Sequence, residues 1–377
     1  SNVMDNSSAF WVVNSLFVFA LSVFCAGVLI PQILLISFRK RLFDVPDERK
    51  IHQGVVPRLG GIAFKPVVFF SVALALGLNM LLGYGQLLGN IGSESRPLAF
   101  GFCTIMMLYL VGMADDLIGI RYRAKFAIQI ICGLLVIAGG LWINNLHGLL
   151  FIHALLEWIG YPITLFAVVF IINAINLIDG IDGLASGLCG VAMLFYGLVF
   201  FIIGEYIYAL LAFATLGALV PFFYYNVFGD PAKKNKIFMG DTGSLTIGMM
   251  TCILSLKLLN GFPVNPSMQQ PNAFFLAYSP LIIPCFDVVR VYLHRVRNGK
   301  NPFLPDKNHI HHKMLAIGMK QRTAMITIVL ISVCFTLCNI LLSRYINVTL
   351  LLVLDIFIWT LGNLWLTRRI HIAHSKL

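Results

Sequence analysis

The chain has 377 residues, of which 59% are hydrophobic and 11% charged, whereas soluble proteins carry about 25% charged residues. With a mean hydropathy of +0.88, this composition excludes a soluble protein, because only a membrane surrounds so much apolar surface. It also excludes a disordered chain and a disulfide-bonded secreted domain. The net charge of +11 requires no nucleic-acid partner, since membrane topology and attraction to anionic lipid account for it.

Apolar segments of about 20 residues, bounded by Gly, Pro and charged residues, predict an all-α polytopic membrane protein. We expect a single transmembrane catalytic domain over residues 1–377. Eleven spans are predicted at 11–37, 59–82, 97–113, 124–143, 161–178, 183–203, 206–225, 243–260, 273–294, 323–342 and 348–366. The first apolar run is too long for a removable signal and is therefore counted as a span.

Positive charge is concentrated in alternate connections between these spans. Of the 27 lysines and arginines, 23 fall in five segments that lie on one predicted side of the membrane. The positive-inside rule makes this side cytoplasmic, so the N-terminus is expected outside and the C-terminus inside. The predicted cytoplasmic loops are 39–58, 114–123, 226–242 and 295–322.

Ionisable residues at the ends of the spans gather on the same predicted side. Five aspartates and three histidines come from connections far apart in the sequence: Asp115, Asp116, Asp179, Asp182, Asp241, His309, His311 and His312. Ionisable groups near membrane depth are costly, and they therefore indicate function. A secondary transporter is the hypothesis from another class; it predicts polar groups near the bilayer centre, where Asp287 and Asp355 are the candidates.

Asp115 and Asp116 stand together at the end of the third predicted span. Adjacent carboxylates repel each other, so such a pair persists where a cation, a proton or a nearby base stabilises it. The alternative is an ordinary polar helix end in water, which a lone pair of aspartates favours. Gly119 at the fifth position excludes the Asp-Asp-x-x-Asp motif of prenyl-diphosphate enzymes.

A polar stripe crosses the end of the fifth predicted span. Asn173, Asn176 and Asp179 recur every three residues and so share one helix face, and Asp182 follows across a turn that contains Gly180. Amides in an apolar span need partners, and hydrogen bonding between helices is the alternative interpretation. Because the stripe continues into two acids, a functional site is favoured.

Asp241 opens the eighth predicted span between Gly240 and Gly243. The small residues let backbone N–H groups approach a phosphate, while the carboxylate can hold a divalent metal. Helix capping by Asp241 or Thr242 is the alternative, and it is compatible with a site. Phe238 just before it is either a packing residue or a platform for a planar base, and packing is favoured when the residue is taken alone.

His309, His311 and His312 lie in the most basic loop of the chain, beside Lys307 and Lys313. Clustered imidazoles disfavour one another's protonation unless an anion gathers them, which suits a diphosphate. Metal ligation is the rival interpretation. Structural zinc is disfavoured because the eight cysteines lie in apolar segments away from these histidines.

The segment 44–61 adds cations and a glycine pair on the same side. Its alternative interpretation is a juxtamembrane basic segment attracted to anionic lipid. Taken together, the sequence offers carboxylates suited to Mg²⁺, basic groups and helix termini suited to phosphates, and a location suited to a lipid substrate. These features predict phosphoryl transfer to or from a lipid phosphate.

In this order and topology, the motifs resemble the polyprenyl-phosphate N-acetylhexosamine-1-phosphate transferase superfamily over residues 44–312. The motifs are the Asp-Asp pair, Asn-x-x-Asn-x-x-Asp-Gly-x-Asp-Gly, Phe-Met-Gly-Asp-x-Gly-Ser and His-x-His-His. Arg49-Lys-Ile-His52 followed by Pro57-Arg-Leu-Gly-Gly61 resembles the WecA/TagO branch, which uses UDP-GlcNAc. The muramoyl-pentapeptide branch, MraY, instead carries Thr-Pro-Thr-Met-Gly-Gly and three consecutive histidines, which this chain lacks.

The resemblance implies transfer of N-acetylglucosamine 1-phosphate from UDP-GlcNAc to undecaprenyl phosphate, with release of UMP, at the bacterial inner membrane. This reaction initiates a cell-surface polysaccharide, and another UDP-N-acetylhexosamine is the alternative donor. The resemblance also implies Mg²⁺, with Mn²⁺ as a substitute. The sequence leaves the oligomeric state open, with a homodimer as one arrangement. Direct attack is favoured over a covalent intermediate, because a metal and a positioned oxyanion suffice for phosphoryl transfer.

Residue roles follow from the same resemblance. The implied catalytic residues are Asp115, Asp116 and Asp241: Asp241, with Asn176, binds the metal, and the Asp-Asp pair engages the lipid phosphate, one member as general base. The implied substrate-binding residues are Asp179, Asp182 and Phe238 at the nucleotide, Asn176, His309, His311 and His312 at the diphosphate or sugar, Lys125 at the lipid phosphate, and Lys50, His52, Arg58 and Asn173.

Overall fold

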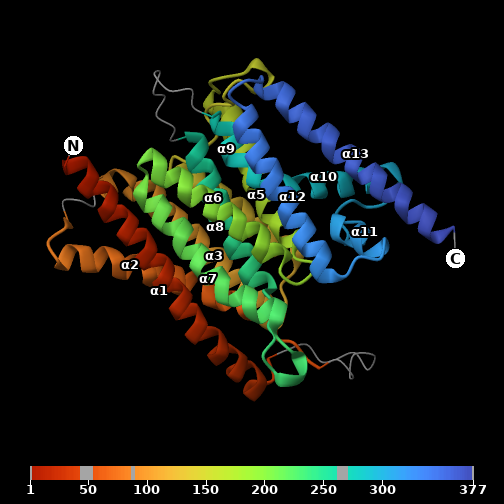
Figure 1. Ribbon diagram of the computed structural model, residues 1–377, viewed down its shortest axis with the longest axis horizontal. Helices are drawn as coiled ribbons and strands as arrows, with labels where there is room; N and C mark the ends of the chain where they lie inside the picture. The colour runs from red at the N-terminus through yellow and green to blue at the C-terminus, as the bar shows by residue number, and fades with distance from the viewer. Residues whose placement is uncertain (1, 43–53, 86–89, 261–270, 376–377) are drawn as a thin grey trace.

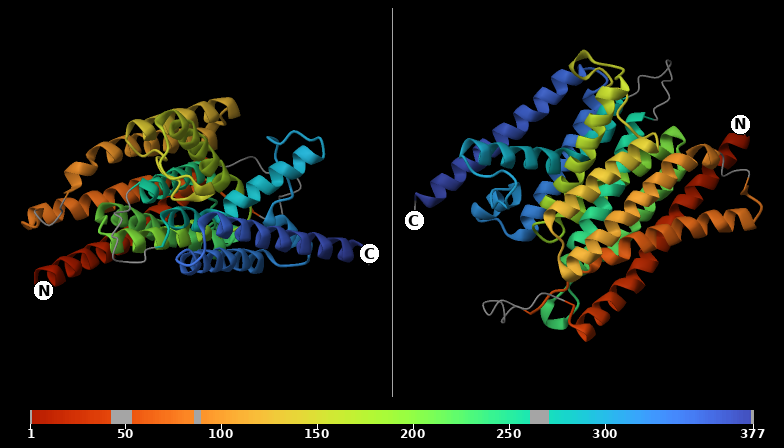
Figure 2. Two further views of the ribbon diagram at one scale, coloured as in Figure 1. Left: turned by 90° about the horizontal axis from the view of Figure 1, so that it is seen from above. Right: turned by 180° about the vertical axis from the view of Figure 1, so that it is seen from behind.

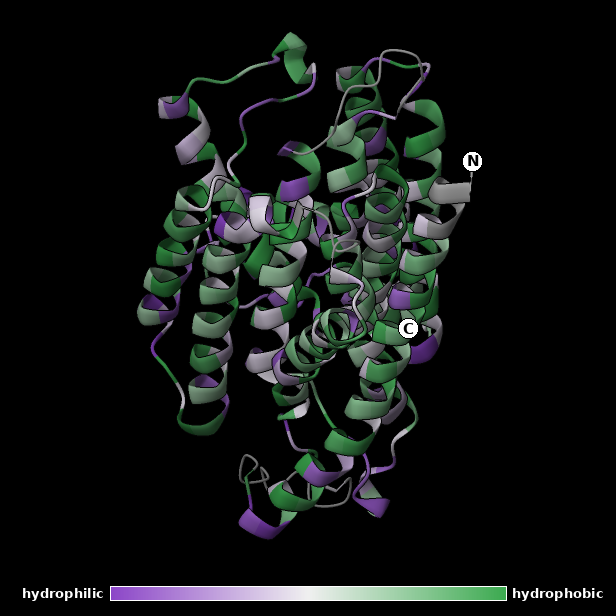
Figure 3. Cartoon of the chain, turned by 90° about the vertical axis from the view of Figure 1, so that its left-hand side faces the viewer, coloured by the Kyte–Doolittle hydropathy of each residue, from purple (hydrophilic) through white to green (hydrophobic). Residues whose placement is uncertain are grey.

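The protein is a bundle of long α-helices (Figure 1). The computed structural model describes residues 2–42, 54–85, 90–260 and 271–375. Ten helices in these ranges are long and apolar enough to cross a membrane. Hydrophobic residues dominate the length of the helices, and hydrophilic residues are concentrated near their ends (Figure 3). The predicted all-α, multi-pass membrane class is therefore confirmed.

Each predicted span coincides with one or more helices. The bounds are α1 Asn2–Lys40, α2 Phe64–Leu81, α3 Ser95–Ile118, α4 Tyr122–Ala138, α5 Glu157–Ile178, α6 Leu184–Ile203, α7 Tyr206–Phe228, α8 Gly240–Asn260, α9 Ala273–Tyr278, α10 Ile282–Arg297, α11 Ile310–Ala316, α12 Gln321–Leu342 and α13 Val348–His374. The predicted span that is not among the ten is the fourth, 124–143, which corresponds to the 17-residue helix α4. It ends before 143 because two glycines follow, and the second has a φ of 90°.

Helix α8 is the centre of the bundle. Within its most apolar stretch 89% of the residues are buried, the largest share among the ten helices. Helices α3 and α5 pack along it, and α1 packs along α7 beside them (Figures 1 and 2). The first turn of α8 is thus enclosed by protein, and any polar group there must find its partners on neighbouring helices.

Glycines let two neighbours approach this first turn closely. The short 3-10 helix η2 (Gly60–Ala63) precedes α2, and a Cβ atom on Gly61 would lie 2.0 Å from the Gly243 nitrogen. A Cβ atom on Gly112 of α3 would lie 2.6 Å from the Thr242 Cα atom. Small residues at helix interfaces permit this backbone contact in membranes.

The predicted span 273–294 is not one continuous helix. It is divided into α9, the 3-10 turn η7 (Ser279–Leu281) and α10. Pro280 explains the break, since proline lacks the N–H group that an uninterrupted helix requires. After the break, α10 extends to the right of Figure 1, where α11 and α13 also lie.

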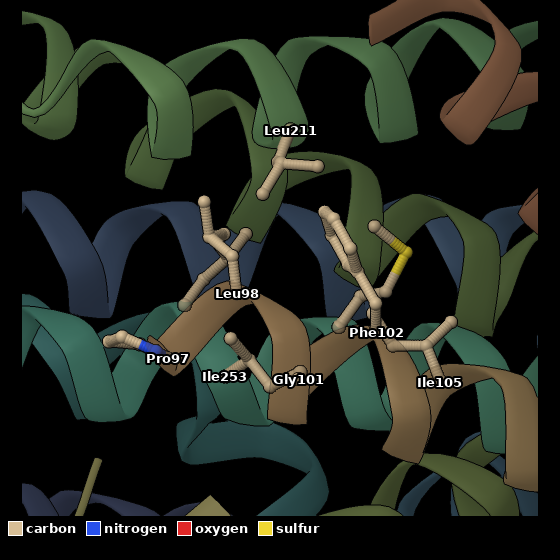
Figure 4. A pocket seen from close by; sticks show the side chains of 9 residues that line it. Pro97, Leu98, Gly101, Phe102, Ile105, Leu211 and Ile253 are labelled. Carbon is tan, nitrogen blue, oxygen red and sulfur yellow. The ribbon is translucent and has the colours of Figure 1, made fainter. Parts of the chain in front are cut away.

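An apolar pocket lies between α3, α7 and α8 (Figure 4). Its lining residues are Pro97, Leu98, Gly101, Phe102, Ile105, Leu211, Met250, Ile253 and Leu254. The Leu98 position is about 25 Å along α3 from Asp115, because a helix rises 1.5 Å per residue. The pocket therefore lies away from the polar end of the bundle and offers it no chemistry.

The contact between η2 and α8 can be tested with Gly61→Ala. We expect this variant to lose about 1–3 kcal/mol of stability, because the added methyl group meets backbone atoms that cannot move aside. Gly77→Ala in α2 is the matched control, since a Cβ atom there would have nothing within 4 Å. Thermal unfolding in detergent measures both. Equal melting temperatures would contradict the close packing.

Candidate active site

Asp116 caps the N-terminus of α8. One carboxylate oxygen accepts the Asp241 backbone N–H at 2.8 Å. The other accepts the Thr242 backbone N–H at 2.9 Å and its hydroxyl at 2.7 Å. The first N–H groups of a helix have no partner within the helix, so a carboxylate from α3 supplies one here. Asp116 thereby fixes the position from which the Asp241 side chain projects.

Asp115 and Asp241 converge on one ammonium group. Lys125, in the first turn of α4, contacts Asp115 Oδ2 at 2.9 Å and Asp241 Oδ2 at 3.4 Å. The second oxygen of Asp241 accepts a hydrogen bond of 3.0 Å from Asn176 Nδ2 on α5. The same amide nitrogen donates to the Ser244 hydroxyl at 2.7 Å. Four helices therefore contribute to one polar cluster.

The donor set of this cluster fits Mg²⁺. Two carboxylates already surround a position of positive charge, and Mg²⁺ prefers hard oxygen ligands from one or two carboxylates and from substrate phosphates. Within the described ranges, no group of three or more His, Cys, Asp or Glu side chains is arranged to hold a metal. A metal here would therefore need substrate oxygens to complete its coordination. Asn176 directs its amide nitrogen at Asp241, so its role as a metal ligand stays a prediction.

Asp179 ends α5 and begins the next polar group. Water reaches its carboxylate, but surrounding protein atoms desolvate it, and this raises its pKa to about 7. The charges of Asp241, Asp182 and Asp116 raise the pKa further, while Arg58 opposes them. Asp182, three residues on, forms an ion pair with Lys236. The acids of three motifs are thus close enough to act on one another.

Arg58 and Phe238 come together at an extended backbone contact. The Phe238 N–H donates to the Pro57 carbonyl at 2.8 Å, and the Gly60 N–H donates to the Phe238 carbonyl at 2.9 Å. Gly240 has a φ of 69° and lies against the Arg58 carbonyl, where a Cβ atom would be only 2.1 Å away. Glycine is required there on both counts. Two predicted residues from distant motifs thus border the start of α8.

The predicted residues Lys50 and His52 lie outside the described residues. Asn173 is described, but it faces another partner. Its amide donates to Gln129 on α4 at 2.7 Å, which is the interhelical bond that formed the alternative interpretation of this residue. Contact of Asn173 with substrate stays a prediction.

The three histidines form a stack beside the α5 turn. The ring centroids of His309 and His311 are 5.8 Å apart, and those of His311 and His312 are 4.1 Å apart. His311 lies against Gly180, where a Cβ atom would be 2.1 Å from its Nε2 atom. The histidine segment therefore reaches the Asp179 turn. The sequence predicts both on the same side of the membrane.

Several ring nitrogens of this stack lack protein partners. Both nitrogens of His311 and Nδ1 of His312 are buried and have no hydrogen-bond partner in the part of the chain that the structure describes. Burial and the neighbouring His312 lower the pKa of His311 to about 4, and burial followed by the neighbouring His309 lowers the pKa of His312. Both rings are therefore neutral at pH 7. Unpartnered buried polar atoms indicate a place for a ligand.

Several contacts of the cluster are not predicted by the sequence. Thr242 bonds Asp116 and Ser244 bonds Asn176. Both residues follow Asp241 in the same motif, and this nearness to Asp241 is the one feature of the sequence that indicates a place in the site. Lys236 is separated from Asp182 by 54 positions, and no sequence spacing indicates their ion pair. For Asp287, the sequence indicates only an acid inside a predicted span.

Comparison with known proteins gives consistent matches. The model of glycosyl transferase family 4 matches residues 98–259, which include the five aspartates. The probable undecaprenyl-phosphate N-acetylglucosaminyl 1-phosphate transferase of Bacillus subtilis (strain 168) is 30% identical over 90% of this chain and 88% of its own length. The undecaprenyl-phosphate alpha-N-acetylglucosaminyl 1-phosphate transferase of Yersinia pestis is 31% identical over 82% of this chain and 79% of its own length.

The transferase of the same name from Escherichia coli (strain K12) is 33% identical over 77% of this chain and 73% of its own length. These alignments extend well beyond the range that the family model matches. The chain therefore belongs to glycosyl transferase family 4, within the group of undecaprenyl-phosphate N-acetylglucosaminyl 1-phosphate transferases that its motifs predict.

Proposed function

We propose that the protein transfers N-acetylglucosamine 1-phosphate from UDP-GlcNAc to undecaprenyl phosphate. An oxygen of the lipid phosphate attacks the β-phosphorus of UDP-GlcNAc. The bond from this phosphorus to the bridging oxygen breaks, and UMP leaves with that oxygen. The product is undecaprenyl-diphosphate-GlcNAc, which can initiate a cell-surface polysaccharide.

One observation carries this proposal. Asp115, Asp241 and Lys125 meet at the buried start of α8, where Asp116 holds the backbone in place. Paired carboxylates with a nearby cation and a positioned helix terminus are the groups that phosphoryl transfer requires, because its catalysis rests on positioning and charge neutralisation. Membership in a family of sugar-phosphate transferases supports the same chemistry.

On the acceptor side, Lys125 would bind the lipid phosphate, which would replace one of the two aspartates as its ion-pair partner. Its ammonium already bridges two carboxylates at the polar end of a helix, and a phosphate oxygen can replace one of them. Asp115 then becomes the available general base for a protonated lipid phosphate. Asp116 is less suited to this role, since both of its oxygens accept hydrogen bonds from α8.

Asp241, together with substrate oxygens, would hold Mg²⁺, and Mn²⁺ would bind the same oxygen ligands. The metal would supply neutralisation of the charge that develops on the diphosphate. Asn176 orients the Asp241 carboxylate through its 3.0 Å hydrogen bond. The protein thus contributes the ligands and their orientation.

On the donor side, the Asp179 turn and the histidine stack would hold UDP-GlcNAc. Phe238 is half-buried near Arg58 and would stack on uracil. The unpartnered nitrogens of His311 and His312 would donate N–H groups to the diphosphate or sugar, because neutral imidazole carries one such donor. Asp182, held by Lys236, would face the nucleotide.

We also propose that the polar end of the bundle faces the cytoplasm of a bacterial cell, across the inner membrane. The N-terminus would then lie outside and the C-terminus inside. The excess of Lys and Arg in the connections at this end supports the orientation.

UMP release by purified protein with undecaprenyl phosphate, Mg²⁺ and separate UDP-sugars tests the function. We expect UDP-GlcNAc to be used best, and UDP-MurNAc-pentapeptide to be used poorly. Preference for another UDP-N-acetylhexosamine would support the proposed reaction but contradict the assignment of GlcNAc as the sugar. Absence of UMP release with every UDP-sugar would overturn the proposal.

Asp241→Asn should reduce turnover by about a hundredfold or more, as loss of a group that neutralises transition-state charge does. Binding of UDP-GlcNAc should persist, because the carboxamide keeps the shape and can still accept from Asn176. Asp230→Asn is the control, since Asp230 only caps a short 3-10 turn outside the cluster. Near-normal turnover of Asp241→Asn at saturating Mg²⁺ would remove this role.

His311→Ala and His312→Ala should each weaken use of UDP-GlcNAc by about 1–3 kcal/mol, the size expected for hydrogen bonds to a charged ligand. Melting temperatures should barely change, and zinc chelators should have no effect on the wild type. If the histidines held a structural metal, the substitutions and the chelators would both lower stability. Lost stability with unchanged affinity for UDP-GlcNAc would exclude these residues from the donor site.

The raised pKa of Asp179 predicts a pH dependence of donor binding. Asp179 is protonated below about pH 7 and ionised above it, so rising pH places a negative charge beside the anionic diphosphate. Metal-free affinity for UDP-GlcNAc should therefore fall by about threefold to tenfold between pH 6 and 8. Asp179→Asn should flatten this dependence in calorimetry. An unchanged pH profile in that variant would assign the titration to another group.

A further inference from the structure

Asp287 is a fully buried carboxylate in α10, with 0% of its surface exposed. Its Oδ2 atom contacts His309 Nδ1 at 2.8 Å, and its Oδ1 atom accepts the Ile310 backbone N–H at 2.9 Å. Arg290, one turn further along α10, contacts Oδ1 at 3.0 Å and also donates to the Asn308 carbonyl. One acid and one arginine therefore hold three consecutive residues at the start of α11.

A second contact holds the preceding part of the loop. Arg295 of α10 forms an ion pair of 2.6 Å with Asp306 and donates to the Asn301 carbonyl at 2.6 Å. The connection between α10 and α11 is thus attached to α10 at both ends. Its conformation follows α10, and the histidines at its end take their position from this helix.

The contact with Asp287 also selects the tautomer of His309. A carboxylate accepts but does not donate, so Nδ1 carries the proton and Nε2 is left for another partner. The Ile310 N–H bond fixes the first turn of α11, which carries His311 to the Gly180 turn. Carboxylates fix the tautomer and ring orientation of metal-binding histidines in the same way.

We propose that Asp287 is a positioning residue for the donor site, which acts through His309 and the start of α11. This inference rests on the proposed function, because it assigns the histidine segment to the diphosphate or sugar. Because Asp287 is fully buried, it would act on the substrate only through other side chains. Its contribution is to orient side chains that do.

Asp287→Asn is the informative substitution. The carboxamide has one oxygen for two sets of donors, so it can satisfy either His309 or Ile310 and Arg290, but not both sets. We expect kcat/KM for UDP-GlcNAc to fall by about tenfold or more. The matched control is Asp355→Asn. Asp355 is also a buried acid in a membrane helix, with 3% exposure, but it binds Tyr278 away from the site.

A double-mutant cycle separates positioning from general stability. If Asp287 acts through His309, the variant with both Asp287→Asn and His309→Ala should be little worse than His309→Ala alone. Fully additive losses would overturn the proposal, since they would mean that none of the effect of Asp287 passes through His309. Asp355→Asn should keep wild-type kcat/KM, and an equal loss there would also overturn it.

Amide hydrogen exchange tests the same proposal without turnover. Asp287→Asn should accelerate exchange across residues 306–313, whereas Asp355→Asn should leave this segment protected. Unchanged exchange in Asp287→Asn would overturn the positioning role. If the wild type releases no UMP, the proposed function fails, and the exchange result still decides whether Asp287 orders the segment. Should Asp287→Asn fail to fold, Asp287→Glu is the alternative, because it keeps the charge and displaces the carboxylate by one methylene. It should give a smaller fall in kcat/KM and a smaller acceleration of exchange across residues 306–313.

Discussion

The N-terminus of α8 is the constraint on which the rest of the structure depends. A helix that begins inside a bundle exposes N–H groups that no water can satisfy, so a neighbouring chain segment must bind them. Asp116 does this with both oxygens, which requires α3 to approach within backbone contact. Gly112 allows that approach of α3, and the contact between Gly61 and Gly243 lets η2 pack on the same turn. The same contacts therefore cap α8, allow its close packing with its neighbours and determine the position of Asp241.

The same constraint determines how several carboxylates persist together. Asp115 and Asp241 repel each other, and Lys125 between them offsets the repulsion. Asp182 is paired with Lys236, whereas burial and the neighbouring acids outweigh the charge of Arg58 at Asp179 and raise its pKa to about 7. The acids thus have graded environments within one cluster, which is how chemically identical groups acquire different roles.

Much of this arrangement is predictable from the sequence, because membrane topology restricts where polar groups can lie. Helix spans follow from apolar length, and alternation of sides brings distant acids to one end. Contacts between individual side chains do not follow from these rules. The capping role of Asp116 and the Lys236 pair depend on helix rotation. Asn173 and Asn176 belong to one three-residue repeat, yet Asn173 binds Gln129 on α4 and Asn176 binds Asp241 on α8. The two amides are nearly one helical turn apart, so they meet different neighbouring helices.

The charge balance of the site explains why its two halves differ. The acidic half carries more carboxylates than cations, whereas burial keeps the His311 and His312 rings of the histidine half uncharged at pH 7. An anion that binds at the histidines favours their protonated forms, and a cation at Asp241 favours its ionised form. Each ligand would then reduce the electrostatic cost of the other. Under the proposed function, a metal-bound diphosphate would supply both charges at once, so the site would suit the pair better than either ligand alone.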